Sequence, residues 1–160
     1  MIKIDNKPFW ICPNGSQIKN EEFDIAVTDL IKRGSRVYVG TDSMLRGDNC
    51  IFATVIAFHN NEKKIATYYY KKFNLVNSEY KNLKIKITEE VNLSVQAAQK
   101  VLEYSPGIDV EVHVDIGLNK ENKTRSMMPV VSGWISGMGF GLKVKPDSWA
   151  SSSIADNHTK

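Results

Sequence analysis

The segment IDVEVHVDIG, residues 108–117, constrains the fold most, because its side chains alternate between apolar and polar. Its apolar positions are Ile108, Val110, Val112, Val114 and Ile116, and its polar positions are Asp109, Glu111, His113 and Asp115. Successive side chains of a β-strand point to opposite faces of a sheet, so the segment predicts a strand with one face in the core. The strand is expected to end beside the carboxylate of Asp115.

Three further β-like runs precede this strand and one follows it. They cover residues 36–43, 50–59, 64–74 and 140–145. Short polar connections join the first three runs, which predicts antiparallel hairpins. The spacing of apolar residues predicts helices over 21–32, 89–104, 126–138 and 149–158. This order of elements indicates an α/β or α+β sheet with helices packed on its faces.

A chain of 160 residues, 42% of them hydrophobic, is long enough for one domain whose core needs no disulfide. Cys12 and Cys50 form no CxxC pair, and such thiols are typical of a reduced cytoplasm. No segment approaches the ~18 apolar residues of a membrane span, so we expect a cytoplasmic protein. The net charge of +3 favours an anionic partner only mildly.

Two aspartates end predicted strands. Asp42 closes the first strand and Asp115 closes the fourth. If a helical crossover makes these strands parallel neighbours, about 4.8 Å apart, both carboxylates lie at the same edge of the sheet. Like charges at that spacing raise each other's pKa unless a cation lies between them, and a divalent ion with oxygen ligands meets that need. Taken singly, each aspartate is more typical of a turn hydrogen bond.

Two further acids lie on predicted helices. Glu90 flanks the apolar stripe of the helix over 89–104, so its side chain is expected to reach the sheet edge, whereas Glu89 is expected to face water. Asp156 on the last helix is expected to complete a cradle for a hard cation. The alternatives are that Glu90 complements the helix dipole and that Asp156 is solvated. The prediction therefore depends on the joint arrangement of the four acids.

A cationic loop follows Asp115 directly. Its basic side chains, with one neutral donor, are expected to meet phosphates beside the acids and to position a nucleic acid without reading its sequence. The expected phosphate contacts are Lys120, Lys123, Thr124, Arg125, Lys145 and Lys160. A basic loop is by itself more often a solvated surface, so this interpretation depends on the acids.

Four segments carry a resemblance to the ribonuclease H-like superfamily, and within it to the YkuK-type family of predicted nucleases. They are VGTDSM, EEVNLSVQAA, VHVDIGLNKENKTR and GWISGMGFGLKVKPDSWASSSIADNHTK. The resemblance implies an α/β fold with a five-stranded mixed sheet in the order 3-2-1-4-5, helices on both faces and an acidic site for Mg²⁺ or Mn²⁺. We therefore expect a ribonuclease H-like domain over 36–160. Residues 1–35 are expected to be an extension with one helix, packed on that domain.

The resemblance also implies roles for the four acids. Asp42, Glu90 and Asp115 match the acids of the first strand, the helix and the fourth strand. Asp156 matches the acid of the final helix, because SSIAD resembles the N-E-x-A-D ending of ribonuclease H. Asp147, just after the fifth strand, is the alternative for this fourth position. The final helix is short relative to typical ribonucleases H, and there is no basic protrusion for gripping an RNA–DNA hybrid.

Together these features predict a nuclease that hydrolyses phosphodiester bonds of RNA, DNA or a hybrid with two divalent ions. The alternative is a catalytically weak or inactive module that binds nucleic acid or a protein partner, because fold does not by itself imply activity. Phosphotransferases of the actin and sugar-kinase type share the topology. They need two such domains around a nucleotide cleft, and a chain of this length accommodates one.

Overall fold

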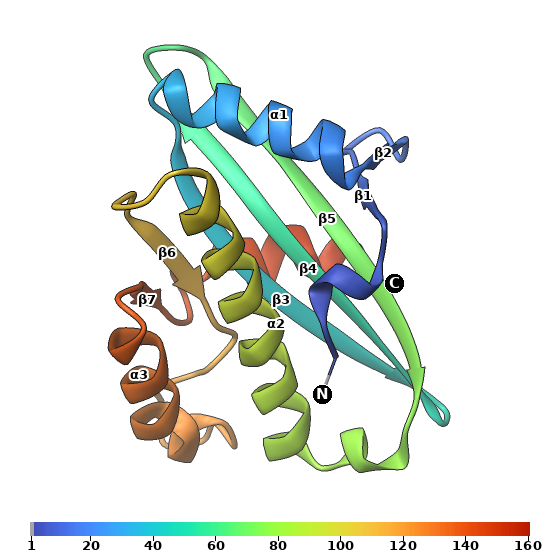
Figure 1. Ribbon diagram of the computed structural model, residues 1–160. Helices are drawn as coiled ribbons and strands as arrows, with labels where there is room; N and C mark the ends of the chain where they lie inside the picture. Colours follow the sequence, from blue (N-terminus) through green and yellow to red (C-terminus); the bar gives the residue numbers. More distant parts are fainter. Residues whose placement is uncertain (1) are drawn as a thin grey trace.

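The computed structural model describes residues 2–160 and has one seven-stranded mixed sheet (Figure 1). Its strands are β1 (Phe9–Ile11), β2 (Gln17–Lys19), β3 (Arg36–Arg46), β4 (Asn49–Asn60), β5 (Ile65–Val76), β6 (Val110–His113) and β7 (Gly141–Lys143). Its longer helices are α1 (Asn20–Lys32), α2 (Leu83–Tyr104), α3 (Met128–Gly137) and the π-helical segment η4 (Ala150–Ala155). Short 3₁₀ helices cover Ile4–Asn6, Ser78–Lys81 and Arg125–Met127. The strand order is β2-β1-β5-β4-β3-β6-β7.

Five of these strands have the expected arrangement, and two were not expected. The order β5-β4-β3-β6-β7 corresponds to 3-2-1-4-5, with antiparallel pairs β3–β4 and β4–β5 and a parallel pair β3–β6. The prediction of five strands is wrong, because β1 and β2 form a hairpin that joins the sheet where Ile11 pairs with Tyr70 of β5. Strands of three residues are too short to show a periodicity. The division between residues 1–35 and 36–160 stays a prediction.

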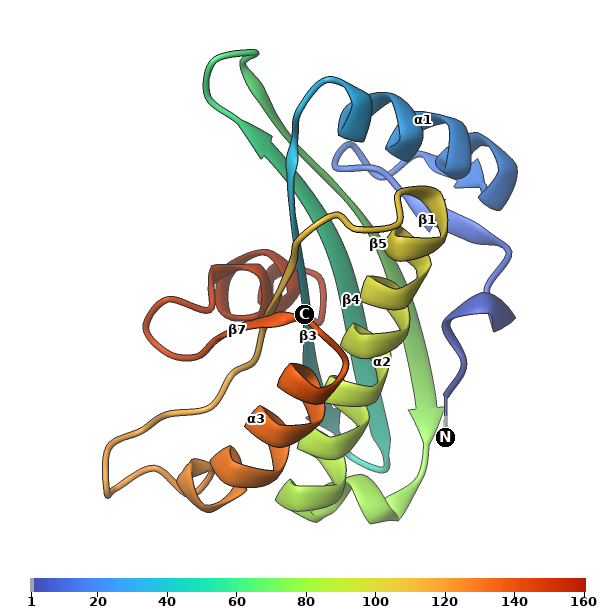
Figure 2. The ribbon, with the colours of Figure 1, turned by 60° about the vertical axis from the view of Figure 1, so that its left-hand side comes forward.

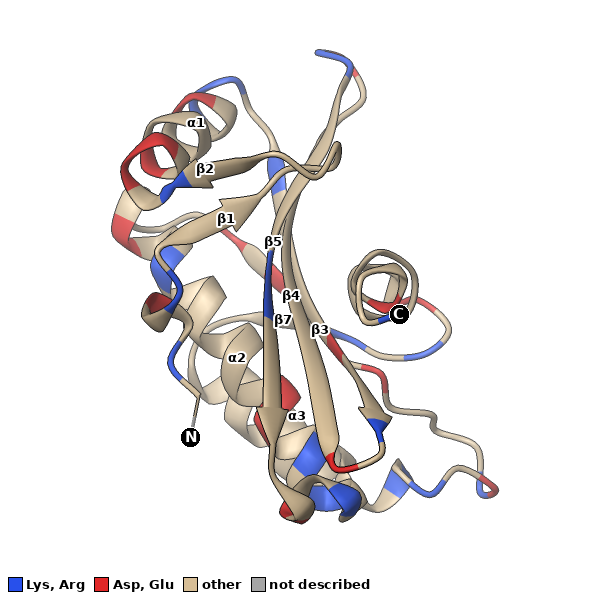
Figure 3. Ribbon diagram, turned by 90° about the vertical axis from the view of Figure 1, so that its right-hand side faces the viewer, with Lys and Arg blue, Asp and Glu red and all other residues tan. Residues whose placement is uncertain are grey.

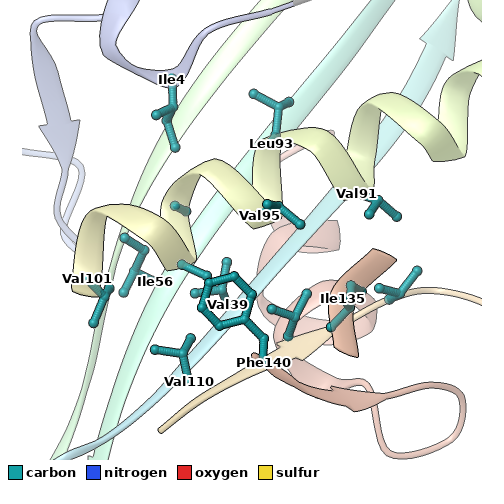
Figure 4. Close-up of a cluster of buried hydrophobic side chains, with 14 of the residues drawn as sticks. Ile4, Val39, Ile56, Val91, Leu93, Val95, Val101, Val110, Ile135 and Phe140 are labelled. Atoms are coloured by element: carbon teal, nitrogen blue, oxygen red, sulfur yellow. The ribbon is translucent and has the colours of Figure 1, made fainter. Parts of the chain in front are cut away.

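Helices cover both faces of the sheet. Figure 3 shows α1 and α2 on one face and η4 on the other, and α3 lies beside α2 (Figure 2). On the α2 face, Val39 of β3 is buried in one large core with Val95 of α2 (Figure 4). The cluster on the η4 face is smaller and consists of Ala53, Val55, Ala57, Tyr70 and Ala155. The odd-numbered residues of β3 therefore face α2, and the even-numbered ones face η4.

Gly40 allows η4 to lie directly against β3. A Cβ atom at this position would be 2.5 Å from the backbone nitrogen of Ser151 and 2.6 Å from the carbonyl carbon of Ala150. Contacts this short to backbone atoms cannot be relieved by a side-chain movement, so a glycine is needed here. This close approach brings Asp156, at the end of η4, over the strand that carries Asp42.

The helix α2 begins at Leu83, six residues earlier than expected. The side chain of Asn82 caps it by accepting two backbone N–H groups of the first turn. Thr88, which precedes the predicted start, lies inside the helix, and its hydroxyl donates to the carbonyl of Lys84 at 2.7 Å. Glu90 therefore lies two turns from the N-terminus of α2, where the helix dipole does not account for its position.

The other helices lie close to their expected positions. A 3₁₀ turn at Arg125–Met127 precedes α3, and Pro129 occupies the first turn of α3, where its missing N–H is tolerated. The strand expected over 140–145 is only three residues long, as β7. In the part of the chain that the structure describes, no helix combines the length and the apolar character needed to cross a bilayer.

Candidate functional site

Asp42 and Asp115 lie on the same face at the end of the parallel pair β3 and β6. Gly40 pairs with His113 in this register, and two more residues along each chain lead to Asp42 and Asp115. The negative charge of Asp115 contributes to a raised pKa of Asp42, which requires the two carboxyls to be near each other. The structure therefore brings these two residues together, on the face that η4 covers.

The pKa of Asp42 is raised further than the pKa of Glu90. Asp42 is only 8% exposed, and its pKa is raised to about 8. Burial is the largest cause, followed by the charge of Glu90 and hydrogen bonding to Asp156, whereas the backbone N–H of Ser43 lowers the value. Two carboxyls that hydrogen-bond share a proton. Burial and the neighbouring acids therefore favour the protonated form of Asp42.

Glu90 reaches the same region from α2. Its Oε2 accepts a hydrogen bond of 2.6 Å from Ser43 Oγ, and Lys86 Nζ lies 3.7 Å away. Burial raises the pKa of Glu90 to about 7, although Lys86 and Ser43 lower it, and Asp115 adds a further rise. Sequence reasoning missed Lys86 and Ser43. The i,i+4 spacing of Lys86 and Glu90 on a helix was the available signal for the first of them.

Glu89, which was expected to face water, is buried. Its Oε1 accepts the backbone N–H of Ile2 at 2.8 Å and the side-chain amide of Asn92 at 3.2 Å. The prediction is wrong because the N-terminal segment lies against this side of α2. A helical wheel describes one helix alone and gives no information about such a neighbour. Of the two adjacent glutamates, Glu90 faces the sheet edge and Glu89 anchors the N-terminal segment.

Asp115 has two partners, and both contact its Oδ1. Ser152 of η4 donates its hydroxyl at 3.1 Å, and Lys145 Nζ lies 3.2 Å away. The backbone N–H of Lys145 also donates to the carbonyl of Ile116 at 3.0 Å, which holds the chain after β7 beside the chain after β6. Lys145 was expected to bind phosphate, but in this structure it binds an acid. Ser152 had no sequence signal.

Asp156 and Asp147 were rivals for the fourth position. Asp156 lies beside Asp42, as described above, and its Oδ2 is 3.4 Å from Lys160 Nζ. Asp147 is exposed, and its charge affects His113 instead. Burial lowers the pKa of His113, and the charge of Asp147 offsets part of this decrease. His113 is fully buried, with Nδ1 accepting the backbone N–H of Ala150 at 3.0 Å. The geometry therefore groups Asp156 with the other acids.

The loop after Asp115 projects away from the sheet (Figure 2). A Cβ atom at Gly117 would be 2.2 Å from the side chain of Asn122, and the N–H of Gly117 donates to Thr124 Oγ1 at 3.1 Å. These contacts close the base of the loop. Its cations Lys120, Lys123 and Arg125 are exposed. They are therefore free to meet a polyanion near the acids.

The acids have the donor atoms of a hard cation site but are not gathered around one point. All are carboxylates, which suit Mg²⁺ or Mn²⁺. Among residues 2–160, no three His, Cys, Asp or Glu side chains are arranged to hold one ion. Ammonium groups pair with three of the acids instead, as Lys86–Glu90 at 3.7 Å, Lys145–Asp115 at 3.2 Å and Lys160–Asp156 at 3.4 Å. Lysines thus neutralise Glu90, Asp115 and Asp156.

Two similarities to known proteins accompany this geometry. A family model described as ribonuclease H-like matches residues 21–160, a range that includes all four acids. The uncharacterized protein YkuK of Bacillus subtilis (strain 168) is 30% identical over 137 residues, which cover 76% of this chain and 77% of the relative.

Proposed function

Because the chain belongs to the ribonuclease H-like family and, within it, to the YkuK-type proteins, we propose that it is a metal-dependent nuclease that hydrolyses phosphodiester bonds. The observation that carries the proposal is the raised pKa of Asp42. Glu90, Asp156 and Asp115 all contribute to it, and they come from three other segments of the chain. A cluster of like charges at the end of parallel strands is costly for folding, and such sites are typically functional.

The proposed metal ligands are the four acids, and the proposed ion is Mg²⁺ or Mn²⁺. Asp42 and Asp115 would share the ions, while Glu90 and Asp156 would each complete one side. When bound, such ions supply an activated water and stabilise the leaving oxygen. Hydrogen bonds from the chain orient two of the ligands, since Ser43 donates to Glu90 and Ser152 donates to Asp115. The loop cations Lys120, Lys123 and Arg125, with Thr124, would position phosphates of the substrate.

A proton must leave Asp42 before this side chain can ligate a cation. Ligands bind metals in their deprotonated form, so metal binding by this site releases protons and strengthens as the pH rises. With the pKa of Asp42 at about 8, the increase is expected to continue through that pH. Isothermal titration calorimetry with Mn²⁺ at several pH values, in buffers of different ionisation enthalpy, measures both the affinity and the proton release.

The decisive experiment replaces single acids and measures cleavage of labelled RNA, DNA and RNA–DNA hybrid oligonucleotides with Mn²⁺ or Mg²⁺. Asp42→Asn and Asp115→Asn are each expected to reduce cleavage by about a thousandfold, because the charge that holds the ions is lost. Asp147→Asn is the matched control. It removes an exposed carboxylate from the same region and is expected to cleave at the wild-type rate. Metal-dependent cleavage that survives Asp42→Asn would refute the proposal.

A second candidate is a module that binds nucleic acid or a protein without turnover. The lysine partners of three acids favour it, because the ion pairs already neutralise charges that a metal would otherwise neutralise. Such a module is expected to bind oligonucleotides equally well with and without a chelator, and Asp42→Asn is expected to leave that binding unchanged. A chelator-sensitive affinity would favour the nuclease.

A further inference from the structure

Lys145 forms an ion pair with Asp115, a proposed metal ligand that lies just beyond the end of β6. Its Nζ is 3.2 Å from Asp115 Oδ1, and its side chain is 45% exposed. The backbone of Lys145 is held by the hydrogen bond from its N–H to the carbonyl of Ile116. The main chain of Lys145 is therefore held beside the site, whereas its ammonium group has access to solvent.

Lys86 is held in a different way. Its Nζ lies 3.1 Å from Ser43 Oγ, 3.4 Å from the carbonyl oxygen of Ser43 and 3.7 Å from Glu90 Oε2, and its side chain is 18% exposed. Three oxygen atoms in a mostly buried place hold Lys86, while one carboxylate oxygen at the surface holds Lys145. Exposed ion pairs contribute only about 0.2–1 kcal/mol. Lys145 can therefore leave its partner at little cost, and Lys86 cannot.

Asp115 does not need Lys145 in order to stay oriented. The hydroxyl of Ser152 donates to the same Oδ1 at 3.1 Å, and Ser148 Oγ lies 2.9 Å from Ser152 Oγ. When the ammonium group leaves, a neutral hydrogen bond still holds the carboxylate in place. Because a hydroxyl carries no net charge, it does not compete with a cation for the charge of Asp115.

From these contacts we infer that Lys145 is an exchangeable counter-ion. It pairs with Asp115 in the ion-free protein, a divalent cation displaces it, and the freed ammonium group binds a phosphate of the nucleic acid. The inference rests on the proposed function and adds a regulation of the site to it. Without nucleic acid, a metal ion and the ammonium group of Lys145 compete for the carboxylate of Asp115. With nucleic acid present, the metal ion pairs with Asp115 and a phosphate pairs with Lys145.

This exchange makes the binding of metal and nucleic acid cooperative. In the absence of nucleic acid, Lys145 weakens metal binding because the ion must displace it. With metal bound, the same side chain strengthens nucleic-acid binding. Coupling of this kind is reciprocal, so metal raises the affinity for nucleic acid by the same factor as nucleic acid raises the affinity for metal.

The test compares the wild-type protein with Lys145→Gln in two measurements. Calorimetric titration with Mn²⁺ alone is expected to show about 2- to 5-fold tighter binding by the variant, which is the loss of one exposed ion pair. Fluorescence anisotropy then follows short labelled RNA, DNA and hybrid oligonucleotides with phosphorothioate linkages that slow cleavage. Mn²⁺ is expected to raise the oligonucleotide affinity of the wild type more than that of the variant.

Two further variants keep the test specific. Lys143→Gln removes the same charge from the last residue of β7, and in residues 2–160 Lys143 has no ion pair with an acid. This control is expected to bind Mn²⁺ within about twofold of the wild type. Lys145→Arg keeps the charge and is expected to keep the coupling. Thermal unfolding of each variant verifies that it is folded.

The outcomes separate this inference from the proposed function. If the wild type binds Mn²⁺ and Lys145→Gln binds it no more tightly, the exchange is wrong and the nuclease proposal stands. Equal tightening in Lys143→Gln also refutes the exchange, because the effect is then one of general charge. If neither the wild type nor the variant binds Mn²⁺ at millimolar concentration, both proposals fail.

Discussion

Lys71 and Asp42 are both buried ionisable residues of the sheet, but their surroundings are opposite. Lys71 on β5 is 1% exposed, and its Nζ donates to the carbonyls of Ile4 and Lys7, at 3.0 and 2.5 Å, and to Asn20 Oδ1 at 3.2 Å. These oxygen atoms belong to the N-terminal segment and the start of α1. The ammonium group thus ties that part of the chain to the sheet.

Asp42 has partners of its own sign. Glu90, Asp156 and Asp115 all raise its pKa, and in residues 2–160 no lysine or arginine forms an ion pair with it. Burial is the largest cause of both perturbations, since it lowers the pKa of Lys71 to about 8 and raises that of Asp42 to about 8. A shifted pKa therefore does not distinguish a structural charge from a functional one. The partners do, because satisfied donors stabilise a fold and crowded like charges do not.

The largest expected effect on stability is at Lys71. Lys71→Met keeps the length of the side chain but leaves three oxygen acceptors without their donor, so we expect a loss of about 2–4 kcal/mol in the free energy of unfolding. Urea unfolding measures this loss. Lys72→Met, the neighbouring position on β5, is the control and is expected to change stability by less than about 1 kcal/mol. A similar small change at Lys71 would contradict the comparison.

Asp42→Asn is expected to have the opposite sign. Removing a charge that its neighbours repel should raise the free energy of unfolding at pH 8 by about 1–3 kcal/mol, while cleavage is lost. Urea unfolding and the oligonucleotide assay, performed on the same preparation, test both parts. Destabilisation by this substitution would mean that Asp42 supports the fold in the way that Lys71 does.

The pH dependence of stability should separate the two residues. Folded Asp42 keeps a proton up to about pH 8 that the unfolded chain loses near 3.8, so stability is expected to fall as the pH rises through this range. Lys71 contributes between about pH 8 and pH 10.5, where the unfolded chain binds a proton that the folded chain has lost. Stability therefore rises with pH in this range. Melting temperatures from pH 4 to 10 measure both trends. Asp42→Asn should flatten the first and Lys71→Met the second.

The smallest expected effect is at Ser43. Ser43→Ala removes the hydroxyl that donates to Glu90 and contacts Lys86, which should cost about 1 kcal/mol of stability. It should also weaken Mn²⁺ binding near neutral pH, because the pKa of Glu90 rises further without this donor. Calorimetric titration at pH 7 and pH 9 tests this, and the deficit is expected to shrink at the higher pH. An equal deficit at both values would contradict this explanation.

Much of the site was predictable because its acids follow regular patterns. The apolar alternation of both strands is visible in the sequence, and their parallel pairing places Asp42 and Asp115 on one face. The prediction that Asp42 ends its strand is wrong, because β3 continues to Arg46 in its pairing with β4. Glu90 was correctly assigned to the side of α2 that faces the sheet, although α2 begins at Leu83 rather than one residue before Glu90. The helical wheel tolerates this error, because the angle between two residues of a helix does not depend on where the helix begins.

Other features had no pattern to reveal them. Three of them depend on where the N-terminal segment lies on the rest of the molecule: the short strands β1 and β2, the burial of Glu89, and the hydrogen bonds of Lys71. The lysine partners of the acids had only weak signals. Lys145 was expected to contact phosphate, because a sequence shows that a cation is near a loop but not which anion it meets first.

The amino-acid sequence by itself determined which stretches form the central strands, which side of each strand is apolar and on which side the acids lie. These properties are local, since they follow from the two-residue and 3.6-residue periods of the backbone. Tertiary structure alone decided the two added strands, the choice between Asp156 and Asp147 as the neighbour of Asp42, and the pairing of lysines with acids. Such contacts join residues far apart in the chain, and their distances exist only once the faces have packed.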